Sequence, residues 1–214
     1  MIIDKIYNRL AMNSLISGNY SKAEKYFKKA MSINSNKEGI NYNCAVAMLG
    51  TKKFDEAEIC LHREMEISGQ NYNTLKTISE LYYISGQRKK ATDYLKKALE
   101  KCSDENESAL LKNKIKNTAD EKAYNKSLKA LELFEKGTAL LNQGEWEKAK
   151  DQFLKALDLD KTNPFVYNNL GFISMMKEKK YFEAREFFKK ALKLSNLPII
   201  KQNLDKVNKI ISQS

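Results

Sequence analysis

The feature that most constrains this chain is a sequence pattern that returns about every 34 residues. Each copy has a turn rich in glycine or lysine, then an alanine, then an aromatic residue or leucine four positions after that alanine. The marker alanines are Ala23, Ala57, Ala91, Ala149 and Ala184, which are spaced by 34, 34, 58 and 35 residues. A repeat of this length indicates stacked supersecondary units rather than one globular core.

Each copy has the pattern of two amphipathic helices. In the first half, apolar residues recur at helical spacing, as in Leu75, Ile78 and Tyr82. Eight glycines and two prolines in 214 residues leave long segments without a helix breaker. The second half of the first copy opens with the spacing of a capping box, so we expect Ser21 and Glu24 to cap that helix. The sequence therefore predicts an all-α fold.

These motifs resemble the tetratricopeptide repeat family, whose pattern is W-x2-L-G-x2-Y followed by A-x3-F. The best first half is Tyr167-Asn-Asn-Leu170-Gly171, and the best second halves surround Ala23, Ala149 and Ala184. The second copy departs from the pattern, with Leu61 for the aromatic residue and Glu64 where the other copies carry alanine. The resemblance implies a right-handed superhelical solenoid of antiparallel helix pairs that acts as a non-catalytic scaffold or adaptor.

On this pattern the chain divides into two arrays of repeats and two further helical segments. Residues 1–105 hold three repeats, at 4–37, 38–71 and 72–105. Residues 130–198 hold two more, at 130–163 and 164–198. The intervening segment 106–129 is either a linker and capping helical segment or a degenerate repeat. Residues 199–214 are expected to form the terminal capping helix that a solenoid needs to stay soluble.

The resemblance places a peptide-binding groove along the first helices of the repeats. Transferring the family's groove positions to this sequence selects mainly apolar residues and asparagines. They are Asn8, Met12, Tyr42, Asn43, Val46, Asn73, Tyr83, Phe134, Phe165, Asn168, Phe172, Met175 and Met176. Such a lining suits a partner's peptide or amphipathic helix, because methionine repacks easily and asparagine bonds to backbone groups. Alternatively, the segment 106–129 or the terminal helix fills the groove from within.

Family members that grip the acidic tails of heat-shock chaperones use a clamp of lysine, asparagine and arginine. The corresponding positions here are Asn8, Met12, Asn43, Asn73 and Thr77, and of these Asn43 alone agrees. A groove without the cations has no means of holding a terminal carboxylate in that way. The expected partner is therefore a different protein, whose identity the sequence does not show.

The formal net charge of +11 raises a second hypothesis, which is RNA or another polyanion. Basic residues recur at equivalent places on the second helices, and stacking would align them as a basic stripe. They are Lys29, Arg63, Lys97, Lys155 and Lys190. Lysine at this place is also ordinary for a solvated helix surface, and the groove is too apolar to read bases. Nucleic acid is thus the alternative partner rather than the expected one.

The composition argues against catalysis and against bound cofactors. The chain has one histidine, and its three cysteines lack the close pairing of a zinc site or a disulfide framework. Nucleotide-binding, zinc-protease and serine-hydrolase motifs are absent from the sequence. No window approaches 18 apolar residues, so no membrane segment is expected. We expect a cytoplasmic protein without metal or cofactor, present as a monomer or a weak homodimer.

Overall fold

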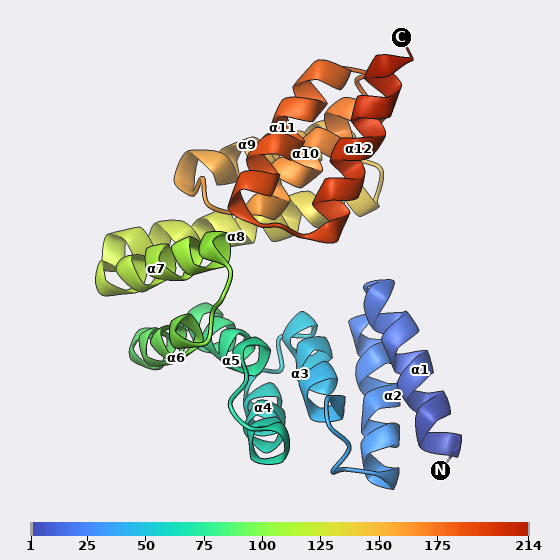
Figure 1. Cartoon of the computed structure of the whole chain (residues 1–214), viewed down its shortest axis with the longest axis vertical. Helices are drawn as coiled ribbons and strands as arrows, with labels where there is room; N and C mark the ends of the chain where they lie inside the picture. The colour runs from blue at the N-terminus through green and yellow to red at the C-terminus, as the bar shows by residue number, and fades with distance from the viewer. Residues whose placement is uncertain (1, 214) are drawn as a thin grey trace. The chain divides into compact units, whose positions relative to one another are not determined.

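The computed structural model describes residues 2–213, which form twelve helices and no strand. The chain separates into two compact units, Met1–Cys102 and Ser103–Ser214. Figure 1 follows the helices from the blue N-terminal end to the red C-terminal end. This all-α arrangement of repeated helix pairs confirms the predicted fold class.

The first unit consists of three antiparallel helix pairs stacked in order. The pairs are α1 (Ile2–Ile16) with α2 (Tyr20–Ile33), α3 (Ile40–Gly50) with α4 (Phe54–Ser68), and α5 (Tyr72–Ile84) with α6 (Arg88–Glu100). The marker alanines of these repeats are fully buried, as are Phe27 and Leu61 four residues after two of them. The small residue thus lets the two helices of a pair approach, and the large one fills the space between them.

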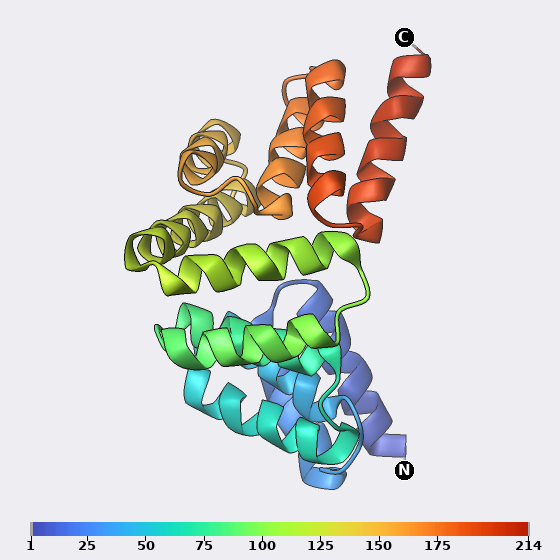
Figure 2. The same cartoon turned by 60° about the vertical axis from the view of Figure 1, so that its left-hand side comes forward.

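The second unit begins with α7 (Glu105–Ala119), which packs against the 22-residue helix α8 (Glu121–Asn142). It continues with α9 (Trp146–Leu159), α10 (Pro164–Met176), α11 (Tyr181–Leu194) and α12 (Pro198–Ser212). Helices α10, α11 and α12 lie side by side, as Figure 2 shows. The segment expected as a linker is therefore helical, and the structure groups it with the second unit.

Local sequence signals set several helix ends. Asn163 caps α10 by accepting a hydrogen bond from the N–H of Phe165, and Pro164 occupies the first turn, where its missing N–H costs nothing. The capping box expected for α2 is wrong: Asn19 caps this helix through the N–H of Lys22. Glu24 lies one turn further along, where it binds Lys28 of its own helix as well as Lys53 and Thr51 of the next repeat.

Candidate functional site

The candidate site is the surface formed by the first helices of the repeats, which we call the first-helix face. In the first unit α1 packs beside α3 and α3 beside α5, so their side chains form one continuous surface. The hydroxyl of Thr77 on α5 donates to the hydroxyl oxygen of Tyr42 on α3, at 3.2 Å, and joins two of these helices. In the second unit α10 and α12 are neighbours in the same way.

The groove residues predicted on the first unit differ in exposure. Asn8, Met12, Tyr42, Asn43 and Val46 are half-buried, and Asn73 is exposed. Tyr83 is buried in the core, so its predicted place at the surface is wrong. The first-helix face of this unit is thus a mixed surface, on which half-buried amides lie among apolar side chains. Amides of this kind can bond to the backbone N–H or C=O of an extended chain.

In the second unit the predicted phenylalanines form an aromatic cluster. The ring of Phe134 on α8 lies 6.5 Å from that of Phe165 on α10 and 6.0 Å from that of buried Phe153. Trp146 stacks on Phe172, with ring centroids 5.8 Å apart. Phe134 and Phe172 are half-buried, while Phe165 keeps 43% of its surface in solvent. The rings therefore continue from the core of this unit to its surface.

Two residues predicted for the groove of the second unit are covered by α12. Asn168 accepts a hydrogen bond of 2.9 Å from the side-chain amide of Asn203, and Met175 packs in a cluster with Val207. Their predicted exposure is wrong. Adjacent residues on a helix point about 100° apart, so Met175 and Met176 do not share a face. Met176 faces outward, with 39% of its surface exposed.

The five residues of the basic stripe are all exposed. Lys29 lies over the ring of Tyr7 and Lys97 over that of Tyr94. Lys155 pairs with Asp151 on its own helix at 2.7 Å. Lys190 and Arg63 complete the set, and the guanidinium of Arg63 donates to the hydroxyl of Ser35. Four of the five cations thus have contacts within the protein that are ordinary for a solvated helix surface.

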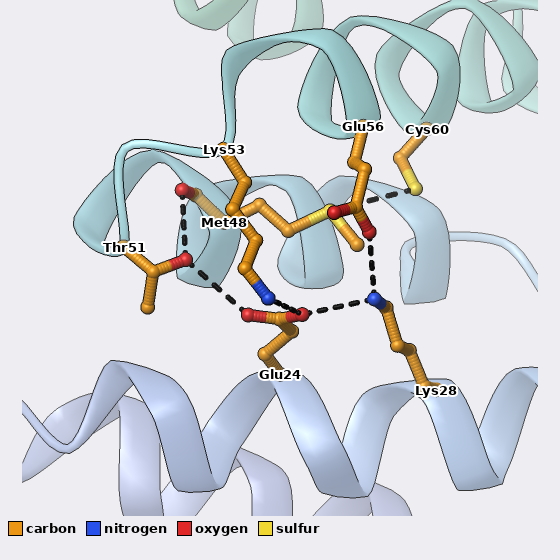
Figure 3. A network of polar contacts seen from close by, with 7 residues as sticks. All are labelled: Glu24, Lys28, Met48, Thr51, Lys53, Glu56 and Cys60. Carbon is orange, nitrogen blue, oxygen red and sulfur yellow. Dashed lines mark hydrogen bonds and ion pairs between the residues drawn. The ribbon is translucent and has the colours of Figure 1, made fainter.

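An ionic network around the buried carboxylate of Glu24 connects the first two repeats, and Figure 3 shows it from close by. Glu24 of α2 accepts hydrogen bonds from Lys53 at 2.8 Å and from Thr51 at 3.2 Å, both in the turn between α3 and α4. Lys28 lies 2.9 Å from Glu24 and 2.7 Å from Glu56. Burial alone would raise the pKa of Glu24, but the bonds from Lys53 and Lys28 outweigh it and hold that pKa below its ordinary value. This network fixes one repeat on the next.

The three cysteines of the chain lie in the part that the structure describes. Cys44 and Cys60 are buried and Cys102 is half-buried, and none of the three forms a disulfide. Among residues 2–213 no three histidine, cysteine or acidic side chains gather as metal ligands would. Within the same residues no helix is both long and apolar enough to cross a bilayer.

Several solved structures are similar to this chain at low sequence identity. Among solved structures, YrrB, described as a TPR protein with an unusual peptide-binding site, is 18% identical with a TM-score of 0.44, over 94% of this chain and 90% of that one. The MamA protein is 15% identical with a TM-score of 0.46, over 91% and 92%. The TPR2AB domain of yeast Sti1 in a complex with pHSP90 is 16% identical with a TM-score of 0.48, over 98% and 84%. Similarity at this level says nothing of what the present chain binds.

Family models identify the repeats directly from the sequence. No curated protein is similar enough in sequence to count as a relative. A model described as TPR repeat matches residues 137–178, and two described as tetratricopeptide repeat match residues 14–63 and 166–196. Together they cover slightly more than half of the chain, in both units. With the helix pairs that the structure places at these residues, the matches show that the chain belongs to the tetratricopeptide repeat family.

Proposed function

We propose that this protein is a non-catalytic scaffold that holds a peptide or amphipathic helix of a partner protein on its first-helix face. Membership of a family of interaction repeats supports the class of function. The observation that carries the proposal is the aromatic cluster of the second unit, where Phe134 supports the exposed ring of Phe165. Met176 at the end of the same helix, α10, extends the apolar surface.

The chemistry of this surface fits an apolar anchor on the partner. An exposed aromatic ring that is backed by buried rings is held in place, so a ligand that covers it gains contact area with little loss of side-chain entropy. Met176, about three turns further along α10, adapts to the shape of the ligand. The half-buried amides Asn8 and Asn43 on the first unit supply hydrogen bonds to a partner's backbone. The aromatic cluster would supply affinity on the second unit, and the amides would orient a chain that is bound to the first unit.

The alternative, polyanion binding by the basic stripe, lacks a specific observation in its favour. The stripe residues are exposed, but most of them contact neighbouring rings, hydroxyls or acids. A mobility assay with single-stranded RNA at low salt tests this alternative, because phosphate contacts weaken steeply as salt rises. Three cysteines without a disulfide suit the reducing cytoplasm that we propose as its location.

A peptide selection with two matched variants tests the proposed function. Peptides are selected from a random library on the wild-type chain, synthesised with a fluorescent label and titrated by anisotropy. Phe165→Ala removes the exposed ring of the first-helix face, and Phe182→Ala removes an exposed ring on the second helix α11. We expect Phe165→Ala to weaken binding at least about tenfold and Phe182→Ala to leave it unchanged. Equal affinities for the wild type and Phe165→Ala would overturn the proposal.

A further inference from the structure

The end of the first unit formed by α1 and α2 has an exposed apolar surface at places that are buried in the following repeats. Ile6 on α1 is 46% exposed, whereas Ile40, one repeat later on α3, is 1% exposed. Leu10 is 37% exposed, and its equivalent Cys44 is fully buried. Ile40 and Cys44 are buried residues of α3, and this helix packs against α2 of the preceding repeat. Ile6 and Leu10 thus have the chemistry of a surface that receives another helix.

The same places are buried throughout the repeats that have a neighbour in front of them. On α5 they hold Thr74 and Ile78, and on α10 they hold Val166 and Leu170, all of which are buried. The second unit shows which residues occupy these places when they face solvent. There α8 carries Glu132 and Lys136 at the corresponding places, and both are exposed. The apolar residues of α1 are therefore unlike those of a solvated end helix.

The apolar surface of α1 extends over more than two turns. Ile2, Ile6 and Leu10 are four residues apart, which places them along one side of the helix, and Ile3 lies beside them. All four side chains are exposed. Tyr7 and Tyr26 of α2 stack on each other at 6.2 Å next to this stripe. We call the set Ile2, Ile3, Ile6, Leu10, Tyr7 and Tyr26 the N-terminal end face.

The charges around this face are of one sign. Residues 2–33, which contain α1 and α2, include two acids, Asp4 and Glu24, and both are buried. Lys37 lies 3.8 Å from Asp4, and the network of the next repeat holds Glu24. The exposed charges of the two helices are all basic. Lys28 pairs with Glu56 of the next repeat, and the others are Lys5, Arg9, Lys22, Lys25 and Lys29. Lys29 lies over the ring of Tyr7, so it borders the end face itself.

We propose that the N-terminal end face docks an amphipathic helix of another protein whose apolar stripe is bordered by aspartate or glutamate. The burial of the equivalent places by helices in later repeats supports a helical occupant, because their side chains pack as ridges into grooves. The basic rim selects the acidic border, since opposite charges on the two surfaces attract. A second copy of this chain would bring two basic rims together, and like charges in that position oppose pairing.

Two designed peptides test the proposed chemistry of the partner. Both are helices of about 18 residues with the same leucine stripe, one bordered by glutamate and the other by lysine. Fluorescence anisotropy measures their binding to the full chain. The glutamate-bordered peptide is expected to bind at least about tenfold more tightly than the lysine-bordered one, and this preference should shrink as salt rises.

Variants locate the binding surface. Ile6→Asp combined with Leu10→Asp is expected to weaken binding of the glutamate-bordered peptide at least about tenfold. The matched control Ile59→Asp, on an exposed position of α4, should leave binding unchanged, and circular dichroism confirms that all variants fold. Phe165→Ala should also leave it unchanged, which separates this surface from the first-helix face. Equal binding of both peptides, or no effect of the α1 variant, would overturn the proposal.

Two further measurements decide between occupants. Sedimentation velocity shows whether the chain dimerises through this face, and vesicles of phosphatidylcholine with phosphatidylserine show whether it binds an anionic bilayer. A dimer that Ile6→Asp abolishes, or vesicle binding without peptide binding, would replace the acidic helix with a second copy or a lipid surface. A monomer that binds the glutamate-bordered peptide and ignores the vesicles supports the proposal.

Discussion

Lys150 of α9 lies 2.5 Å from Glu178, which precedes α11, and this ion pair mirrors the one between Glu24 and Lys53 with the charges exchanged. Both Lys150 and Glu24 directly follow a marker alanine. The side chain of each reaches the turn between the two helices of the next repeat, and its partner, Glu178 or Lys53, lies in that turn. The hydrogen bond from Lys150 and the charge of Lys180 hold the pKa of Glu178 below its ordinary value. We call each of these ion pairs a joint between repeats. In the first joint the acid is on the earlier repeat, and in the second joint the base is.

This symmetry predicts that the charges of the second joint can be exchanged. Lys150→Glu places two carboxylates together, and Glu178→Lys gathers three lysines, so each single variant should lower the free energy of unfolding by about 1 to 3 kcal/mol. The double variant restores an opposite pair in the polarity of the first joint and should recover at least about half of the loss. Urea unfolding of the four proteins measures the coupling. Additive losses in the double variant would contradict this account.

The ionic network around Glu24 predicts that the free energy of unfolding depends on pH. A carboxyl whose pKa is lower in the folded chain contributes stability that is present above the unfolded-state pKa, about 4.3, and is lost as pH falls through the folded value. Glu24 is such a group. In Glu24→Gln the free energy of unfolding should therefore fall less between about pH 5 and about pH 3 than in the wild type. The exposed Glu147, changed to Gln, is the control and should keep the wild-type slope. Equal slopes for Glu24→Gln and the wild type would refute the prediction.

The repeat pattern predicts most of the fold, because the period of the marker alanines depends on contacts within and between neighbouring helix pairs. Ala23 and Phe27 are buried as this pattern requires, and Asn163 caps α10 just before Pro164. The capping prediction for Glu24 failed for a physical reason. A local motif offers the side chain one partner, but two lysines of the folded structure bind it more strongly than a single backbone N–H.

The candidate site was predicted less well, because exposure depends on which neighbour covers a residue. Met175 and Asn168 occupy family groove positions, yet α12 covers both of them. In the opposite direction, Ile6 and Leu10 have the sequence character of core residues and are exposed because no repeat precedes them among the described residues. The repeat pattern identifies the place of a residue in a helix pair. It does not identify which helix or partner covers the outer surface of the first pair or of the last pair.

Glu64, the departure from the repeat pattern in α4, is predicted to stabilise the start of α3. Its carboxylate is buried and accepts hydrogen bonds from the backbone N–H groups of Gly39 at 2.7 Å and Tyr42 at 3.2 Å. Glu64→Ala restores the residue found in other repeats but leaves these half-buried donors without an acceptor. The expected loss is about 1 to 3 kcal/mol in the free energy of unfolding, and Glu64→Gln, which keeps one acceptor, should lose less. Hydrogen exchange should show faster exchange at the amides of Gly39 and Tyr42, and unchanged rates there would contradict the capping role.

Gly171 in α10 is predicted to be required for the close approach of α11. A methyl group at this position would lie 2.7 Å from the ring of Phe188, which is fully buried and has no room to move. Gly171→Ala should therefore lower the free energy of unfolding by about 1 to 3 kcal/mol, despite the better helix propensity of alanine. The control is Gly50→Ala, where the added methyl meets the ring of Tyr20, an exposed side chain that can turn into solvent. Thermal unfolding followed by circular dichroism compares the two.

A second change should compensate for the added methyl group. In the second repeat Leu61 occupies the position of Phe188, and Ala45 occupies the position of Gly171. The change Phe188→Leu should therefore recover part of the loss in Gly171→Ala. A loss in Gly50→Ala as large as that in Gly171→Ala would show that the buried ring is not the cause.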